Sequence, residues 1–222
     1  MFRRTCVLGL ILVAALYIIK CVVFFAMKVE LAEFQPAGVI FLLDTSASNK
    51  TLQWRQEDTI LKICKRLDSE DKSWIYIVTE DAYRIYNENP HRLNDIRKAF
   101  AERGQLDAKA YGTAYGLALK KAVNDALLFK EEGYKPAIVV LGDLENEGDI
   151  TKQINWDKLP ANMEKTLKHI PELSLAFLYA HPKKLDDARD KLRNVIPENQ
   201  LFFSSEENVD LTVNRFIKAI GR

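Results

Sequence analysis

Cysteine is scarce in this 222-residue sequence, and its scarcity excludes two classes of site. Of the three cysteines, Cys6 and Cys21 fall within an apolar N-terminal stretch, which leaves Cys64 alone in the polar remainder. A single thiol forms no disulfide within that remainder and makes no cysteine zinc site. Cys64 lies on an apolar helical stripe, so we interpret it as a small core residue.

A basic excess is also missing. From Lys28 onward the chain has 29 basic and 31 acidic residues, a net charge near −2. Nucleic-acid binders usually carry a basic excess or a basic stripe, so we expect no nucleic-acid partner. The whole chain is 48% hydrophobic and 28% charged, which is typical of a globular protein and argues against whole-chain disorder.

Glycine-rich phosphate-binding loops are absent too. Neither GxGxxG nor GxxxxGK[ST] occurs, which argues against a nucleotide-binding enzyme. The three histidines, His91, His169 and His181, are scattered along the chain and lie beside loops or helix ends. We therefore interpret them as surface residues and not as members of a catalytic triad.

One long apolar run is present, and it lies at the N-terminus. Residues 5–27 hold a single charge, Lys20, and a bilayer-spanning helix needs about 20 apolar residues. We predict an uncleaved signal-anchor transmembrane helix over residues 1–27, because small residues at the spacing of a signal-peptidase site are hard to find. The alternative is a cleaved signal peptide with Val7–Ile19 as its apolar core.

The charges that flank this run predict its orientation. Arg3 and Arg4 precede it, whereas the other flank mixes Lys28 with acidic residues. Because basic flanks tend to stay in the cytoplasm, we expect a single-pass membrane protein with a cytoplasmic N-terminus. The domain that follows would then be periplasmic or extracellular. If the segment is cleaved instead, the domain is secreted.

After a linker over residues 28–37, apolar strands alternate with amphipathic helices. The expected strands are Gly38–Leu43, Ser73–Thr79, Ala82–Tyr86, Ala137–Leu141, Leu173–Tyr179 and Gln200–Phe203. The expected helices are Thr51–Leu67, Arg92–Glu102, Thr113–Glu131, the later part of Ile154–Ile170, Pro182–Val195 and Asn208–Ile220. This order predicts one α/β domain over residues 38–222, with a doubly wound, mostly parallel, Rossmann-like sheet. A hairpin over residues 73–86 would supply one antiparallel edge strand.

Polar oxygens follow two of the expected strands. The first strand ends in the run Asp44–Ser48 (DTSAS), the central one ends in Gly142-Asp143, and Thr113 begins the long helix. In a doubly wound sheet, ligands bind at the carboxyl ends of the strands. Carboxylates and hydroxyls are hard ligands that suit Mg²⁺ or Mn²⁺ better than zinc. These residues also have ordinary interpretations as turn residues or as helix N-caps, Ser48 and Thr113 among the latter.

In this order the three segments resemble the von Willebrand factor A-type (VWA) domain and its metal-ion-dependent adhesion site (MIDAS). The similarity runs from GVIFLLDTSAS through YGTAYGLALKKA to AIVVLGDLENEGD. The family often has glycine after the aspartate of the central strand, where this chain has Leu144. The resemblance implies a Mg²⁺ site, or a Mn²⁺ site, whose direct ligands are Ser46, Ser48 and Thr113, with Asp44 and Asp143 binding directly or through water.

Such a ligand set leaves the ion with residual charge. Three neutral hydroxyls and at most two carboxylates under-neutralise a divalent cation and leave a coordination position open. An acidic side chain of a protein partner can fill that position. We therefore expect a non-enzymatic module for adhesion, assembly or scaffolding. The alternative is a Mg²⁺-dependent phosphoryl-transfer or phosphatase enzyme with Asp44 at its site, although Ser46 stands where such families usually have a second acid.

Two further groups of residues border the predicted site. Glu145, Glu147 and Asp149 form either a solvated acidic loop or an additional cation site. Tyr111 and Tyr115 flank Thr113 and could line the ligand-binding face, while core packing is an equal alternative for Tyr115.

Overall fold

The computed structural model of this chain describes residues 17–20, 35–103, 112–145 and 148–222. The chain divides into two compact units, Met1–Gln35 and Pro36–Arg222. Residues 17–20 are helical, and the rest of the predicted anchor lies outside the described residues. Within the part of the chain that is described, no helix combines the length and the apolar character needed to cross a membrane.

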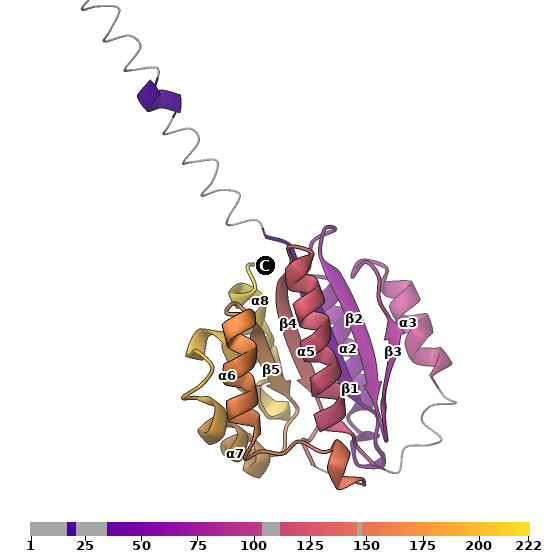
Figure 1. Ribbon diagram of the computed structural model, residues 1–222. Helices are drawn as coiled ribbons and strands as arrows, with labels where there is room; N and C mark the ends of the chain where they lie inside the picture. The colour runs from indigo at the N-terminus through magenta and orange to yellow at the C-terminus, as the bar shows by residue number, and fades with distance from the viewer. Residues whose placement is uncertain (1–16, 21–34, 104–111, 146–147) are drawn as a thin grey trace, which may run out of the picture. The chain divides into compact units, whose positions relative to one another are not determined.

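A six-stranded sheet forms the middle layer of the second unit (Figure 1). Its strands are β1 (Ala37–Asp44), β2 (Lys72–Val78), β3 (Ala82–Tyr86), β4 (Lys135–Leu141), β5 (Ser174–Leu178) and β6 (Leu201–Ser204). Their order is β3-β2-β1-β4-β5-β6, and every neighbouring pair is parallel except β2 and β3. The predicted mostly parallel sheet with an antiparallel edge strand is thus confirmed.

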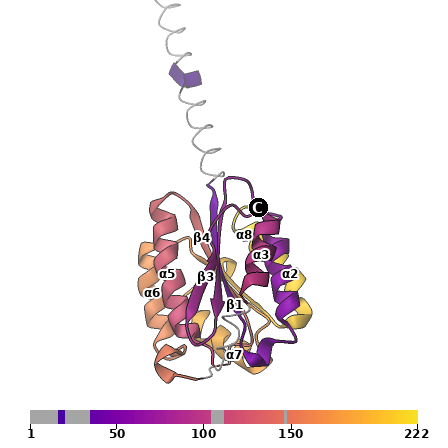
Figure 2. The same ribbon diagram turned by 90° about the vertical axis from the view of Figure 1, so that its right-hand side faces the viewer.

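Helices cover both faces of this sheet (Figure 2). They are α2 (Gln53–Cys64), α3 (Leu93–Glu102), α5 (Tyr115–Glu131), α6 (Leu159–His169), α7 (Pro182–Leu192) and α8 (Val209–Ala219), with short 3₁₀ helices η1 (Ala47–Asn49), η2 (Ile150–Lys152), η3 (Glu198–Gln200) and η4 (Glu206–Asn208). One apolar core joins the sheet to α5, α6 and α7, and a second joins it to α2, α3 and α8. This is the doubly wound architecture that the sequence predicted.

Strand β1 shows why its sequence is continuously apolar. Ile40 and Leu42 belong to the core under α5, whereas Val39, Phe41 and Leu43 belong to the core under α2 and α8. Side chains alternate between the two faces of a strand, and here both faces are buried. Because α2 and α5 sandwich it, β1 holds its carboxyl end in a fixed position.

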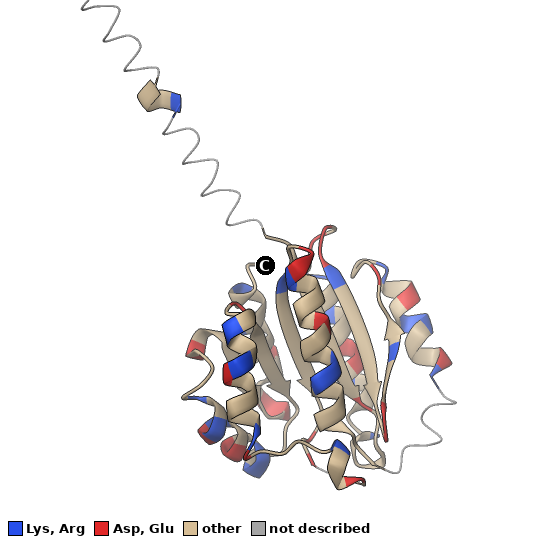
Figure 3. Ribbon diagram, in the orientation of Figure 1, with Lys and Arg blue, Asp and Glu red and all other residues tan. Residues whose placement is uncertain are grey.

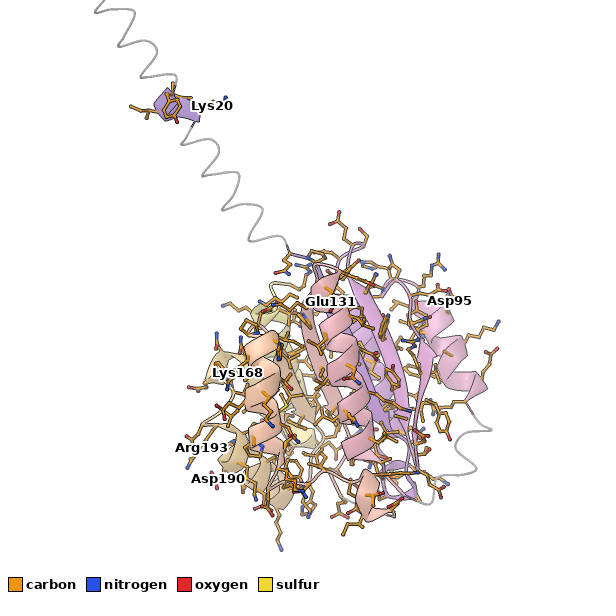
Figure 4. All side chains as sticks on the ribbon, viewed as in Figure 1. Lys20, Asp95, Glu131, Lys168, Asp190 and Arg193 are labelled. Atoms are coloured by element: carbon orange, nitrogen blue, oxygen red, sulfur yellow. The ribbon has the colours of Figure 1, made fainter. Side chains whose placement is uncertain are left out.

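The charged residues on the helices reflect the nearly balanced charge of the sequence. Residues of both charge signs occur along α3, α5 and α6 (Figure 3). The labelled side chains of Asp95, Glu131, Lys168 and Asp190 lie on the outer helices (Figure 4). The three histidines are exposed, as predicted.

The expected core cysteine is confirmed. Cys64 has no exposed surface, and its burial raises the pKa of the thiol to about 12. Its side chain belongs to the core under α2 and α8.

Candidate metal centre

The candidate site lies at the carboxyl ends of two neighbouring strands. β1 ends at Asp44, and β4 ends at Leu141, one residue before Gly142. Because β1 and β4 pair in parallel, their carboxyl ends meet at the same edge of the sheet. Two polar segments that lie about a hundred residues apart in the sequence therefore become neighbours.

Asp44 is the most heavily bonded side chain of this site, and it is completely buried. Its Oδ1 accepts a hydrogen bond from the backbone N–H of Ser46 at 2.8 Å. Its Oδ2 accepts from the Asn49 amide and from the Tyr115 hydroxyl, each at 2.5 Å. The Asn49 oxygen in turn accepts from Gln56 Nε2 at 3.1 Å. Three donors thus fix the orientation of this carboxylate.

All of these donors are neutral. None of the ion pairs between the described residues includes Asp44 or Asp143. Burial raises the pKa of Asp44 to about 7, the hydrogen bonds from Tyr115 and Ser46 act in the opposite direction, and the nearby charge of Asp143 raises it further. A buried carboxylate of this kind is costly to ionise unless a cation compensates it.

The serine hydroxyls lie beside this carboxylate. Ser46 is buried, Ser48 is exposed, and their Oγ atoms are 3.0 Å apart. Ser48 lies inside η1 and the N-cap of α2 is Leu52, so the interpretation of Ser48 as the cap of the following helix is wrong. Ser46 precedes η1 but makes no capping hydrogen bond. Both hydroxyls are free of that structural role.

Thr113 lies two residues before the start of α5 and is buried. The N-cap of this helix is Ala114, and no side chain caps it, so the interpretation of Thr113 as an N-cap is wrong. The Ala114 N–H donates to the Thr79 carbonyl at 2.7 Å, which ties this segment to the end of β2. Two residues after Thr113, Tyr115 reaches Asp44.

An open pocket of about 300 Å³ adjoins this segment, and it is lined by Glu80, Gly112, Thr113, Ala114, Gly148, Asp149 and Lys152.

Asp143 is half-buried on the segment that follows β4. Its Oδ1 accepts from the Glu145 N–H at 2.8 Å, and its carbonyl accepts from the His181 N–H at 3.0 Å. The preceding Gly142 lies against Asp44, because a Cβ atom there would come within 2.7 Å of the Asp44 Cβ. A side chain at position 142 would therefore push the two segments apart.

Leu144 takes the place at which the resemblance anticipates glycine. It adopts a φ of 62°, a left-handed conformation that costs a non-glycine residue about 1–2 kcal/mol. Its side chain is 1% exposed and belongs to the core under α5. The loop thus keeps a glycine-like turn, and burial of the leucine side chain offsets the strain.

The structure therefore places some of the predicted metal ligands in direct contact with one another. Asp44 and Ser46 share a hydrogen bond, as do Ser46 and Ser48, while Thr113 and Asp143 lie within two residues of contacts to Asp44. Among the described residues, no three or more His, Cys, Asp or Glu gather as a metal cluster. A centre here would depend on hydroxyl oxygens, which suit Mg²⁺.

Sequence reasoning missed one residue and left another open. The sequence gives no signal that marks Asn49, and it leaves Tyr115 equally open to the ligand-binding face and to the core. Tyr115 is 1% exposed and contacts Asp44, so it is both a core residue and a member of the site. Burial and the charges of Asp44 and Asp143 raise the pKa of Tyr115 far above its usual value, so its hydroxyl is a proton donor.

The acidic loop is only partly described. Glu147 and Tyr111 lie outside the described residues. The Asp149 carboxylate caps η2, accepting from the Thr151 N–H at 2.9 Å and from its hydroxyl at 2.7 Å. Asp149 is exposed, as a solvated loop residue would be.

Comparisons with known proteins identify the fold of this chain. No protein-family model matches the sequence, and no curated protein matches it. BatB from Bacteroides thetaiotaomicron matches with 15% identity and a TM-score of 0.59, over 84% of this chain and 100% of that one. An aerotolerance-related membrane protein from Bacteroides fragilis matches with 16% identity and a TM-score of 0.55, over 83% and 98%.

The VWA domain of SpRpn10 matches with 13% identity and a TM-score of 0.59, over 82% of this chain and 95% of that one. This chain spans less than half of two other similar structures, 46% of a mussel byssus matrix protein and 42% of a von Willebrand factor type A protein from Catenulispora acidiphila. These likenesses show that the second unit, over its described residues, has the fold of a VWA domain.

Proposed function

We propose that this chain, whose fold is that of a VWA domain, binds a protein partner through a Mg²⁺ ion at the carboxyl ends of β1 and β4. The observation that carries this proposal is Asp44: a fully buried carboxylate that no basic side chain neutralises among the described residues. It lies next to hydroxyls that cap no helix. A divalent cation would compensate the charge and use those oxygens.

The side chains divide into two roles in this proposal. The hydroxyls of Ser46, Ser48 and Thr113 would hold the ion directly. Both oxygens of Asp44 already accept hydrogen bonds, so this carboxylate suits a bond through water, and Asp143 adds the second negative charge. When bound, Mg²⁺ would supply residual positive charge at an open position, which favours an acidic side chain of the partner. Mn²⁺ would suit the same oxygens.

A binding role also fits Asp44 better than catalysis does. A phosphoryl-transfer enzyme would need one Asp44 oxygen free to attack phosphorus. Here the side chain is buried and both oxygens are held by donors. We therefore favour a non-enzymatic module for adhesion, assembly or scaffolding.

The metal is tested with a double variant of the full chain, Asp44→Ala with Ser46→Ala. Wild-type protein should gain about 2.7 kcal/mol of unfolding free energy at Mg²⁺ concentrations a hundredfold above the dissociation constant, and EDTA should reverse the gain. The double variant should fold but lose this response. Thr45→Ala is the matched control, because its hydroxyl lies between the two positions and is not in the proposed ligand set. Loss of folding in the double variant would show that the site is structural.

We further propose that the N-terminal segment anchors the domain to a membrane, with the domain outside the cytoplasm. The support is the apolar run of residues 5–27 with Arg3 and Arg4 before it. One protein of similar fold is described as a membrane protein. Protease added to intact cells or spheroplasts should digest the domain. Complete protection before lysis, with digestion after it, would reject this orientation.

A further inference from the structure

The hydroxyl of Tyr115 connects all three segments of the candidate metal centre. It donates to Asp44 Oδ2 at 2.5 Å, and it accepts a longer hydrogen bond from the Leu144 N–H at 3.4 Å. Tyr115 itself begins α5, two residues after Thr113. One buried oxygen atom therefore links the end of β1, the segment after β4 and the start of α5.

The segment after β4 is shaped around this hydroxyl. A Cβ atom at Gly142 would lie 2.0 Å from the Tyr115 oxygen, so a residue larger than glycine would displace the ring. Two residues later, Leu144 holds its left-handed φ of 62°. Strained backbone of this kind persists only where surrounding contacts fix it, and the Tyr115 oxygen supplies one of those contacts.

The Asp44 carboxylate depends on the same hydroxyl for its orientation. Ser46 holds Oδ1 through its backbone N–H, while Tyr115 and Asn49 share Oδ2. Removing the Tyr115 oxygen would leave one donor on each carboxylate oxygen. It would also break the link from Asp44 to the segment that carries Asp143.

We propose that Tyr115 is a positioning residue of the metal centre, whose hydroxyl fixes Asp44 and joins it to residues 142–144 so that the ligands are assembled before the ion binds. This inference rests on the proposed function and deepens it. Tyr115 acts through Asp44 and is not itself a ligand. A preassembled site loses less conformational freedom on binding, and such outer partners tune metal affinity strongly.

The test is Tyr115→Phe in the full chain, which removes one oxygen and keeps the ring. Mg²⁺ affinity, measured by isothermal titration calorimetry, should fall about ten- to a hundredfold. Tyr76→Phe is the matched control. The Tyr76 hydroxyl also donates to a carboxylate at 2.5 Å, that of Asp125, and the ring belongs to the same core. This control should bind Mg²⁺ within about twofold of wild type.

Two readouts distinguish positioning from a general loss of stability. In metal-free protein, amide exchange at Leu144 should be faster in Tyr115→Phe and unchanged in Tyr76→Phe. Addition of Mg²⁺ should perturb the tyrosine absorption spectrum of wild type and of Tyr76→Phe, but not that of Tyr115→Phe.

The outcomes separate this inference from the proposed function. Mg²⁺ affinity of Tyr115→Phe within about twofold of wild type would overturn the positioning role. If wild type binds no Mg²⁺, the proposed function fails, and exchange at Leu144 alone decides whether Tyr115 holds the segments: faster exchange supports it and unchanged exchange overturns it. If Tyr115→Phe does not fold, the Mg²⁺-induced tyrosine spectrum decides. Its presence in wild type and Tyr76→Phe supports the role, and its absence overturns it.

Discussion

A buried carboxylate lies at each end of strand β1, and the negative charges of the two are compensated differently. At its start, the Ala37 N–H donates to Asp71 Oδ1 at 2.7 Å, and Arg222 pairs with the same carboxylate at 2.5 and 2.8 Å. At its end, the donors to Asp44 from the described residues are all neutral. The negative charge of Asp71 is neutralised by Arg222 of the same chain. The negative charge of Asp44 is instead suited to a cation from outside the chain. The two aspartates thus differ in their partners and not in their burial.

Removing the cation that neutralises Asp71 should have the largest effect on folding. Arg222→Ala leaves the Asp71 charge buried without its cation, which typically costs about 3–5 kcal/mol. Urea denaturation should show that loss, while Mg²⁺ affinity of the folded protein stays unchanged. Arg193→Ala is the control, because its pair with Asp190 is exposed and worth about 1 kcal/mol or less. Equal losses in both variants would contradict the comparison.

Near the Asp44 end of β1, Leu144→Gly should have an intermediate effect on the free energy of unfolding. Glycine relieves about 1–2 kcal/mol of left-handed strain, but loss of a buried leucine side chain costs about 2–5 kcal/mol. The lost burial outweighs the relieved strain, so we expect a net loss of about 2 kcal/mol in urea denaturation. Leu144→Ala keeps the strain and should be less stable than the glycine variant. The reverse order would show that the turn is unstrained.

Thr113→Val should have the smallest effect on folding, because Thr113 caps no helix. The hydroxyl alone is removed, so unfolding free energy should change by about 1 kcal/mol or less. Partner affinity should fall roughly 30-fold, about 2 kcal/mol, if Thr113 helps to orient the ion. A pull-down with and without EDTA on the full chain identifies the partner for this measurement. EDTA-insensitive capture, with a stability change alone in the variant, would reject the metal bridge.

The fold was predictable because apolar periodicity is a local signal. β3 matches its expected bounds, and the continuous run of β1 was expected from burial on both faces. The start of α5 was not predictable in the same way. Thr113 and Ala114 read as helix, but the Ala114 N–H bonds to Thr79 and the helix begins at Tyr115.

The candidate site was predictable only in its motif residues. Asp44 and Ser46 belong to a spaced pattern that ends a strand, which is visible in the sequence. The role of Asn49 depends on a chain of contacts from Gln56 through Asn49 to Asp44, and polar residues near a helix start are too common to reveal it. The hydroxyl of Tyr115 reaches Asp44 across 71 residues, a tertiary contact without a local pattern.

The placement of β1 has a mechanical consequence. If the proposed function holds, a partner at the metal would pull near Asp44, where β1 ends, and a membrane anchor would pull on the chain before Pro36, next to Ala37, where β1 begins. β1 is paired along its length with β2 on one side and β4 on the other. A tension applied between its two ends would load both rows of backbone hydrogen bonds together, in shear, so the strand would resist as a unit instead of peeling away bond by bond. β1 would thus serve as a tether as well as a scaffold.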